Sequence, residues 1–438
     1  MAETATGNAL LPRFAAVRAR TEEIFRIVSP EAFESRPISL RHPIVFYRGH
    51  LPAFCVNTLL KKALGRPGIR EDFETLFERG IDPSDDEEAA RVSIARWPPR
   101  SDIEAYLREA DSRLRAAYEE IDAGRGGETA REAAQLCVEH EEMHHETLLY
   151  ILHRLDFSMK VAPDRAPEPV FGAPPARETI RVPAGRATLG AAPGEISFGW
   201  DNEFPRFVVD VPAFEIDRDD VTNGSFLEFV DAGGYRDERW WDGLAWTWIR
   251  ADDVEHPLFW EREGDRWRWR GMFAAFDLPL SWPVYVSHAE ASAFARWKGK
   301  RLPTEAEFHR AAYATPAGTE RSFPWGEELP DPSRGNFAMK RFDPVAVGAF
   351  PAGQSSWGVR DLLGNGWEWA STVFAGFPGF RPSPLYPGYS ADFFDGAHFV
   401  MKGGSPATAA GLLRRSFRNW FQPRYPYPYA TFRCASGV

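Results

Sequence analysis

The chain has few cysteines, no long basic run and no long apolar run, and each shortage argues against a class of protein. Its 438 residues include only three cysteines, Cys55, Cys137 and Cys434, which argues against a disulfide framework and for a reducing compartment. Only seven of the 52 basic residues are lysine, which we attribute mainly to genomic composition. No long basic run occurs, and the formal net charge is −11. We therefore expect no nucleic-acid partner and no anionic membrane partner.

No segment approaches the length of apolar chain that crosses a bilayer. The first residues, Met1–Thr4, are neither basic nor followed by an apolar stretch, so we expect no signal peptide. These features predict a soluble, cytoplasmic protein.

Tryptophan is distributed unevenly along the chain. Only Trp97 precedes residue 165, and the other fifteen of the 16 tryptophans follow it. The stretch between the halves, Val161–Pro169 followed by Pro174 and Pro175, is typical of a semi-rigid linker. We expect a first domain over residues 1–160, a linker over 161–177 and a second domain over 178–438.

The first domain has apolar residues at helical spacing in four long segments, which predict a four-helix bundle. The capping box Ser101-x-x-Glu104 is expected to begin the third segment, and a minor helix is expected near Glu71–Arg79. The four segments are Leu11–Ile27, Pro43–Ala63, Ser101–Ile121 and Arg131–Leu155.

The second domain has short β-rich runs, such as Glu178–Val182 and Arg206–Val211. Helical periodicity occurs only near His288–Trp297 and Pro303–Tyr313. This pattern predicts an α+β domain with a high loop content, in which packed tryptophan supplies much of the core.

Two histidines four residues apart in the last helical segment of the first domain are the strongest chemical signal. His140 and His144 project from one helix face, so two neutral ring nitrogens can converge on one metal ion. His50, in the second helical segment, is a third candidate ligand. Three histidines leave coordination positions open, as a catalytic metal site requires.

The same segment formally fits the HExxH pattern of zinc proteases, although the other elements of such a protease are missing. The neighbouring residues have plainer interpretations. His145 is expected behind the ligands or at the surface, His42 in a loop, and Glu141, Glu142 and Glu146 on the helix surface.

The C-terminal segment Arg418–Tyr429 interleaves aromatic rings with polar side chains, among them Asn419, Gln422 and Arg424. A packed, proline-ordered segment would explain the rings. A pocket for a polar, cationic small molecule would explain the mixture, because rings attract cations and amides fix orientation.

Both halves resemble known families. The first is similar to the DinB-like bundle of the non-heme iron sulfoxide synthases of ergothioneine and ovothiol biosynthesis, on Arg41–His50 and on the element formed by His140, His144 and Glu146. The second resembles the formylglycine-generating-enzyme fold, a variant of the C-type-lectin fold. Its markers are Asp220–Asn223, Arg301–Glu307, Gly364–Trp369, Lys402–Ser405 and Thr431–Arg433.

The resemblance implies an enzyme that uses Fe(2+) and O2 in ergothioneine biosynthesis. Such an enzyme joins the sulfur of a thiol to an imidazole carbon of a histidine derivative, Nα-trimethylhistidine (hercynine), and oxidises the sulfur to a sulfoxide. The iron would be held by His50, His140 and His144, which leave half of an octahedral site open for substrates.

Two positions depart from the relatives that use γ-glutamylcysteine. Met143 stands where those enzymes have a Gln that contacts the imidazole substrate, and Phe421 where they have an Asp that helps to hold the thiol. The imidazole-binding Asn419 and Trp420 are retained, and Arg424 is placed in the same substrate pocket. We therefore expect cysteine, rather than γ-glutamylcysteine, as the thiol.

The pair Tyr386 and Tyr389 resembles a family loop in which the first tyrosine is the active-site acid and the second lines the imidazole pocket. A phenol is protonated at neutral pH and donates one hydrogen bond, so it suits that role. Alternatively, Tyr386 stacks on neighbouring prolines, or the acid is one of three further phenols: Tyr425, Tyr427 or Tyr429.

Other functions stay open at this point. They are an ovothiol- or selenoneine-type synthase, a zinc-dependent thiol transferase or hydrolase, and a non-catalytic lectin-like binding module. Formylglycine-generating activity is disfavoured, because it needs a pair of nearby cysteines and only Cys434 lies in the last quarter of the chain.

Overall fold

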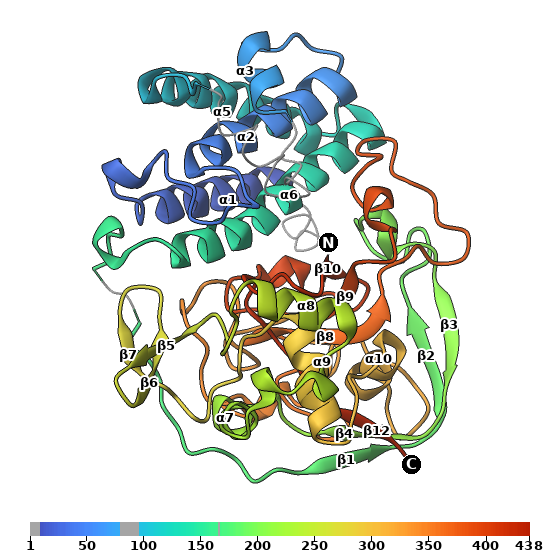
Figure 1. Ribbon diagram of the computed structural model, residues 1–438. Coiled ribbons are helices and arrows are strands. Elements are labelled where there is room, and N and C mark those ends of the chain that lie inside the picture. Colours follow the sequence, from blue (N-terminus) through green and yellow to red (C-terminus); the bar gives the residue numbers. More distant parts are fainter. Residues whose placement is uncertain (1–8, 79–95, 165–166) are drawn as a thin grey trace. The chain divides into compact units, whose positions relative to one another are not determined.

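The computed structural model describes residues 9–78, 96–164 and 167–438 (Figure 1). The chain separates into two compact units, Met1–Asp164 and Arg165–Val438. Two expectations refer to residues outside these ranges: the absence of a signal peptide refers to Met1–Thr4, and the minor helix was expected to reach Arg79. Within the described ranges, no helix is both long and apolar enough to cross a membrane. All three cysteines are buried and free.

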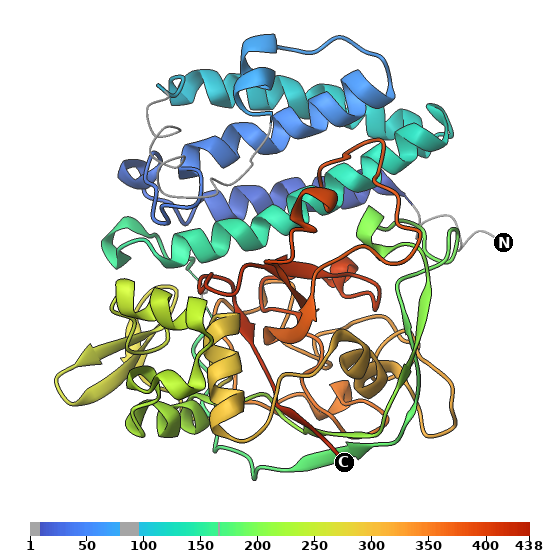
Figure 2. The ribbon, with the colours of Figure 1, turned by 45° about the vertical axis from the view of Figure 1, so that its right-hand side comes forward.

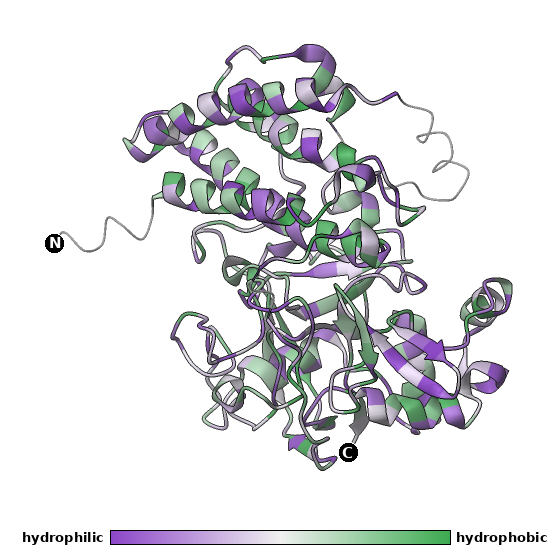
Figure 3. Cartoon of the chain, turned by 90° about the vertical axis from the view of Figure 1, so that its left-hand side faces the viewer, coloured by the Kyte–Doolittle hydropathy of each residue, from purple (hydrophilic) through white to green (hydrophobic). Residues whose placement is uncertain are grey.

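The first unit is a four-helix bundle, as its amphipathic segments predicted (Figure 2). Its helices are α1 (Leu10–Phe25), α2 (Ile44–Cys55), α5 (Arg100–Asp122) and α6 (Gly127–His153), with the short α3 (Glu71–Leu76). Both α1 and α2 pack against α5 and α6, and α3 packs on α2. Hydrophobic and hydrophilic residues are interspersed along these helices (Figure 3), and the helices bury their apolar residues against their neighbours.

The helix α2 is buried along its whole length. Pro43 precedes its first turn, where the missing N–H removes no helical hydrogen bond. Pro52 lies inside the helix, and the chain continues beyond Cys55 as a π-helix, Val56–Ala63. The predicted helical segment Pro43–Ala63 is therefore continuous, but it is not α-helical throughout.

The predicted capping box at Ser101 is wrong. The helix α5 begins at Arg100, directly after the extended Pro99, so Ser101 already lies in the first turn. Its hydroxyl donates to the carboxylate of Asp102 at 3.2 Å instead of capping the helix. Pro99 takes the N-cap place, with φ −53° and ψ 141°, so the helix starts two residues earlier than the Ser-x-x-Glu pattern indicated.

The second unit is an α+β domain with four small sheets and long loops, as predicted (Figure 1). Its strands are β1 (Thr179–Val182), β2 (Gly185–Leu189), β3 (Phe207–Val211), β4 (Phe214–Asp217), β5 (Trp260–Glu263), β6 (Arg266–Arg270), β7 (Ala275–Asp277), β8 (Gly366–Val373), β9 (Phe399–Gly404), β10 (Asn419–Phe421), β11 (Ala430–Thr431) and β12 (Ala435–Gly437). The largest sheet has the order β10–β9–β8–β11, with β11 parallel to β8 and the other pairs antiparallel. The smaller sheets are β1–β4–β12, β2–β3 and β5–β6–β7.

The helices of this unit are α7 (Asn223–Asp231), α8 (Gly243–Ala251), α9 (His288–Trp297) and α10 (Glu305–Tyr313). The last two match the predicted segments, whereas α7 and α8 were not predicted. Both have side-chain caps: Thr222 accepts from the N–H of Ser225, and Asp242 from that of Ala245. The capping signals were present and could have identified both helices; length does not explain why they were missed, because the predicted α10 also has nine residues.

Three of the sequence motifs meet in the core of the second unit. The fully buried guanidinium of Arg433 pairs with Asp220 at 2.9 Å and with Glu368 at 2.5 Å. Burial raises the pKa of both carboxyl groups, and the guanidinium opposes that rise. Because a buried charge is unfavourable unless it is paired, the three residues depend on one another and connect the end of β4 with β8 and β11.

Candidate functional site

Three histidines from two helices of the bundle converge. His50 comes from α2, and His140 and His144 from successive turns of α6. One ligand nitrogen of each lies within 4.8 Å of the other two. Met143, which directly precedes His144, is partly exposed. The i,i+4 spacing and the buried α2 thus produce a compact set of three nitrogen donors.

Hydrogen bonding orients the first of these donors. The Nδ1 atom of His50 lies 2.8 Å from the carbonyl oxygen of Phe77, so Nδ1 carries the proton and Nε2 keeps its lone pair. That Nε2 lies 3.3 Å from Nε2 of His144. Two lone pairs at this distance repel unless a proton or a metal ion lies between them.

Burial favours the metal-binding form of the cluster. It lowers the pKa of His50 to about 4, and those of His140 and His144 well below their usual range. All three rings are therefore neutral at pH 7, which is the form that coordinates a metal ion. A set of three neutral imidazoles fits a divalent transition metal.

Aromatic rings pack against the cluster. Phe54 stacks on His140 with ring centroids 3.5 Å apart and planes 5° apart, and Phe46 stacks on His50 at 5.0 Å. These contacts restrict the rotation of the two imidazoles. His42 lies in the loop before α2, as expected, and stacks on Phe46 at 4.1 Å instead of joining the three donors.

The interpretation of the neighbouring acidic residues as surface charge is wrong. Glu141 pairs with Arg18 of α1 at 2.8 Å and also accepts from the hydroxyl of Thr21. The ring of His145 lies 2.7 Å from the same hydroxyl, away from the three donors. Burial raises the pKa of Glu141, and Arg18 opposes that rise. The helix α6 is buried on two faces, so these side chains point into the bundle; Glu142 and Glu146 are buried as well.

In the second unit, several predicted substrate residues form a cluster of rings. The rings of Tyr389 and Trp420 meet edge to face at 5.3 Å, and those of Tyr386 and Tyr389 lie 5.8 Å apart. Trp420 also stacks on Phe374 at 4.0 Å. Residues 386 and 389, from one loop, and residue 420, from β10, are thereby brought together.

Other predicted substrate residues lie outside this cluster. Alternate residues of a strand point to opposite faces, so Asn419 and Phe421 share a face of β10 that Trp420 does not. The side-chain oxygen of Asn419 accepts from the N–H of Trp420 at 2.9 Å. Phe421 stacks on Tyr425 at 5.1 Å, and Arg424 is exposed.

Two contributors were missed from the sequence. One is the carbonyl of Phe77, which orients His50, and a backbone group has no sequence signature. The other is the buried segment Trp200–Glu203, whose Trp200 stacks on Tyr389 at 3.9 Å. A single turn has no periodicity, so only its density of aromatic and acidic residues could have indicated it.

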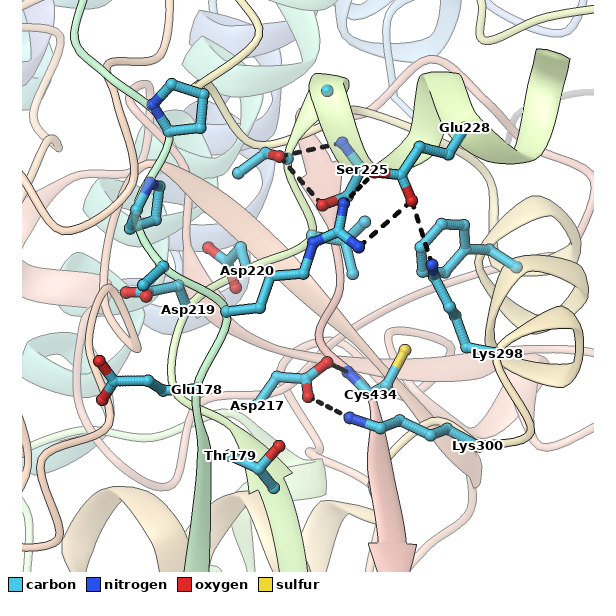
Figure 4. Close-up of a pocket in the computed structure, with 18 of the residues that line it drawn as sticks. Glu178, Thr179, Asp217, Asp219, Asp220, Ser225, Glu228, Lys298, Lys300 and Cys434 are labelled. Carbon is cyan, nitrogen blue, oxygen red and sulfur yellow. Dashed lines mark hydrogen bonds and ion pairs between the residues drawn. The ribbon is translucent and has the colours of Figure 1, made fainter.

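The second unit also contains a pocket of ≈ 420 Å³ lined by charged side chains (Figure 4). Lys300 binds Asp217 at 2.5 Å, and Glu228 binds both Arg177 and Lys298. No predicted site residue lines this pocket. Its ion pairs connect α7 and the end of α9 to the segment before β1, which is a structural role.

Comparison with known proteins identifies both units. Residues 13–148 match the DinB superfamily, and residues 166–438 match the sulfatase-modifying factor enzyme 1-like domain. The hercynine oxygenase of Mycolicibacterium thermoresistibile is 36% identical over 85% of this chain and 82% of its own. That of Mycobacterium tuberculosis is 39% identical over 68% of this chain and 70% of its own. Ergothioneine biosynthesis protein 1 of Neurospora crassa is 30% identical over 93% of this chain and 55% of its own.

The chain therefore belongs to the family of two-domain proteins, with a DinB-superfamily bundle followed by a sulfatase-modifying factor enzyme 1-like domain, that includes the hercynine oxygenases. The family resemblance and the fold class predicted from the sequence are confirmed.

Proposed function

We propose that the protein is an iron(II)- and O2-dependent sulfoxide synthase of ergothioneine biosynthesis. It joins the sulfur of a thiol to the imidazole of Nα-trimethylhistidine and oxidises that sulfur to a sulfoxide. The observation that carries the proposal is the convergence of three neutral histidines in a chain that is 36% identical, over 85% of its length, to a hercynine oxygenase.

His50, His140 and His144 would hold the iron. Their nitrogens are close together, with His50 and His140 buried and His144 partly buried, and the Phe77 carbonyl fixes the lone pair of His50 on the side that faces His144. Three protein donors leave half of an octahedral site for other ligands. Bound iron(II) supplies the redox chemistry with O2 that zinc lacks.

The ring cluster of the second unit would bind the histidine derivative. A trimethylammonium group is attracted to aromatic faces, at roughly 0.5–2 kcal/mol per contact, and Tyr389 and Trp420 supply such faces. Asn419, which lies outside this ring cluster on the other face of β10 from Trp420, would contribute its amide. Tyr386, whose ring lies 5.8 Å from that of Tyr389, would donate the proton of its Oη during formation of the C–S bond.

We further propose free cysteine as the thiol. Phe421 is apolar and stacks on Tyr425, so this position offers no charged partner to the γ-glutamyl group of a larger thiol. The smaller thiol needs no such partner.

Product analysis tests the proposal. The protein is loaded with iron(II) without oxygen, mixed with cysteine and hercynine, and exposed to air while O2 uptake is recorded. We expect O2 uptake and a sulfoxide in which cysteine and hercynine are joined, detected by mass spectrometry, and neither with zinc-loaded protein. An O2-independent thiol reaction of zinc-loaded protein, with no joined sulfoxide from the iron-loaded protein, would instead support a zinc-dependent transferase or hydrolase. Unmethylated histidine in a parallel reaction distinguishes an ovothiol-type substrate.

A further inference from the structure

The segment Trp200–Glu203, which we call the 200–203 strap, is almost wholly enclosed. Its four residues are exposed by 7% or less. It forms a single 3-10 turn, η4 (Asp201–Glu203), in which the carboxylate of Glu203 accepts from the N–H of Trp200 at 2.8 Å. Two of its four side chains are acidic, and burying acidic groups outside regular structure is unfavourable unless they have partners. The partners of these two acidic side chains show which parts of the second unit the strap binds.

The carboxylate of Asp201 holds both ends of the loop that carries the two tyrosines. One oxygen accepts from the N–H of Ser383 at 3.2 Å, and the other accepts from the hydroxyl of Ser390. Ser390 also accepts from the side chain of Asn202 at 3.0 Å. Residues 383–390 are thus closed by one carboxylate, with Tyr386 and Tyr389 between its two contacts.

The rest of the strap connects this loop to β10. Trp200 stacks on Tyr389 with ring centroids 3.9 Å apart. Glu203 pairs with Arg414 at 2.5 Å and accepts from the hydroxyl of Ser416 at 2.6 Å, a few residues before Trp420. One short segment therefore contacts Tyr389 directly and also binds the chain that leads to Trp420.

Burial raises the pKa of Asp201, and the bonds from Ser390 and Ser383 oppose that rise. An amide at this position can still accept from the N–H of Ser383, but its NH2 group can only donate to Ser390, so the charge-assisted bond from the Ser390 hydroxyl is lost.

We propose that Asp201 is a positioning residue that holds Tyr386 and Tyr389 in place by closing the loop 383–390. This inference rests on the proposed function, in which Tyr386 is the proton donor and Tyr389 lines the imidazole pocket. Asp201 itself contacts no reacting atom in this account; it acts through the tyrosines.

Hydrogen exchange of the loop tests the positioning without any catalysis. The variants are Asp201→Asn and Ser390→Ala, and the control is Asp277→Asn, an exposed aspartate of β7 that pairs with Arg268. We expect exchange of the amides of 383–390 to become roughly tenfold faster in both variants, because a closing hydrogen bond to a charged group is lost, and to stay unchanged in the control. Wild-type exchange in both variants would overturn the proposal. Ser390→Ala decides the matter if Asp201→Asn does not fold.

The product ratio tests the consequence for the reaction. In both variants we expect less sulfoxide and more cysteine sulfinic acid per O2 consumed, with a higher KM for hercynine. A purely structural role lowers only the amount of active protein, which leaves the ratio unchanged. Faster loop exchange with a wild-type ratio would therefore also overturn the proposal. If the wild type forms no joined product, the proposed function fails, and the exchange experiment alone decides whether Asp201 holds the loop.

Discussion

Two adjacent histidines of α6 provide a matched test of the metal centre. His145 is buried and His144 is partly buried, and burial lowers the pKa of both. His144 shares the cluster with His50 at 3.3 Å between Nε2 atoms, whereas His145 binds Thr21. We predict that His144→Ala loses metal binding and that His145→Ala loses stability but keeps metal binding.

The expected changes in metal affinity and in the free energy of unfolding follow from these contacts. Loss of a group that only orients a ligand reduces metal affinity about 10–100-fold, so loss of a ligand should cost about 100-fold or more. At an iron(II) concentration about 100 times the wild-type Kd, bound metal stabilises the wild type by about 2.7 kcal/mol and His144→Ala by less than about 0.5 kcal/mol. His145→Ala removes one buried hydrogen bond, for a loss of about 1–3 kcal/mol with or without metal.

The assay is anaerobic thermal unfolding with and without iron(II), followed by a metal titration. For a unit of this size, the difference corresponds to a metal-induced rise in Tm that is roughly 5–9 °C larger in the wild type and His145→Ala than in His144→Ala. A full rise in Tm and one-to-one binding in His144→Ala would refute the assignment of the ligands. A loss of binding in His145→Ala would show that the two faces of α6 were assigned wrongly.

Three further predictions concern the acid, the thiol and the pH dependence of stability. Tyr386→Phe should keep iron and substrate binding but shift the product from sulfoxide towards cysteine sulfinic acid; an unchanged ratio by mass spectrometry would assign the proton to another residue. Competition kinetics should give a higher kcat/KM for cysteine than for γ-glutamylcysteine, and the opposite order would mean that Phe421 does not select the smaller thiol. Burial raises the pKa of Asp361 from 3.8 to about 6, so protonation favours the folded state. This contribution is complete below pH 4 and is lost as the pH rises through 6, by about 3 kcal/mol. Asp361→Asn, which can still accept from the N–H of Gly348, should be more stable than the wild type in urea unfolding at pH 8 and equally stable at pH 4; equal stability at both would refute this.

The bundle could be predicted because long helices repeat their apolar residues every three to four positions, and α1, α2, α5 and α6 all do so. The same regularity brings His140 and His144 to one face of α6. The sequence could not show that α6 is buried on a second face, because that depends on α1 packing beside it. Glu141 was therefore misread as surface charge, although it meets Arg18 inside the bundle. His145 was expected behind the ligands or at the surface, and it is buried beside Thr21, so the surface alternative is wrong.

For the second unit, the sequence predicted the fold class but not the arrangement of the strands. Its strands have two to eight residues, and its core depends on contacts distant in sequence, such as Arg433 with Asp220 and Glu368. The 200–203 strap has no periodicity, and Asp201 gains its partners from residues more than 180 positions away. A sequence motif can mark residues such as Arg433 as typical of a family, but only the folded structure shows which side chains they bind.

Anomalous scattering from crystals of the iron-loaded protein, grown without oxygen, tests the central claim most directly. Data collected on both sides of the iron absorption edge identify the element as well as its position. The account predicts one iron peak bonded to the imidazole nitrogens of His50, His140 and His144. A peak elsewhere in the protein, or none at these three histidines, would contradict it.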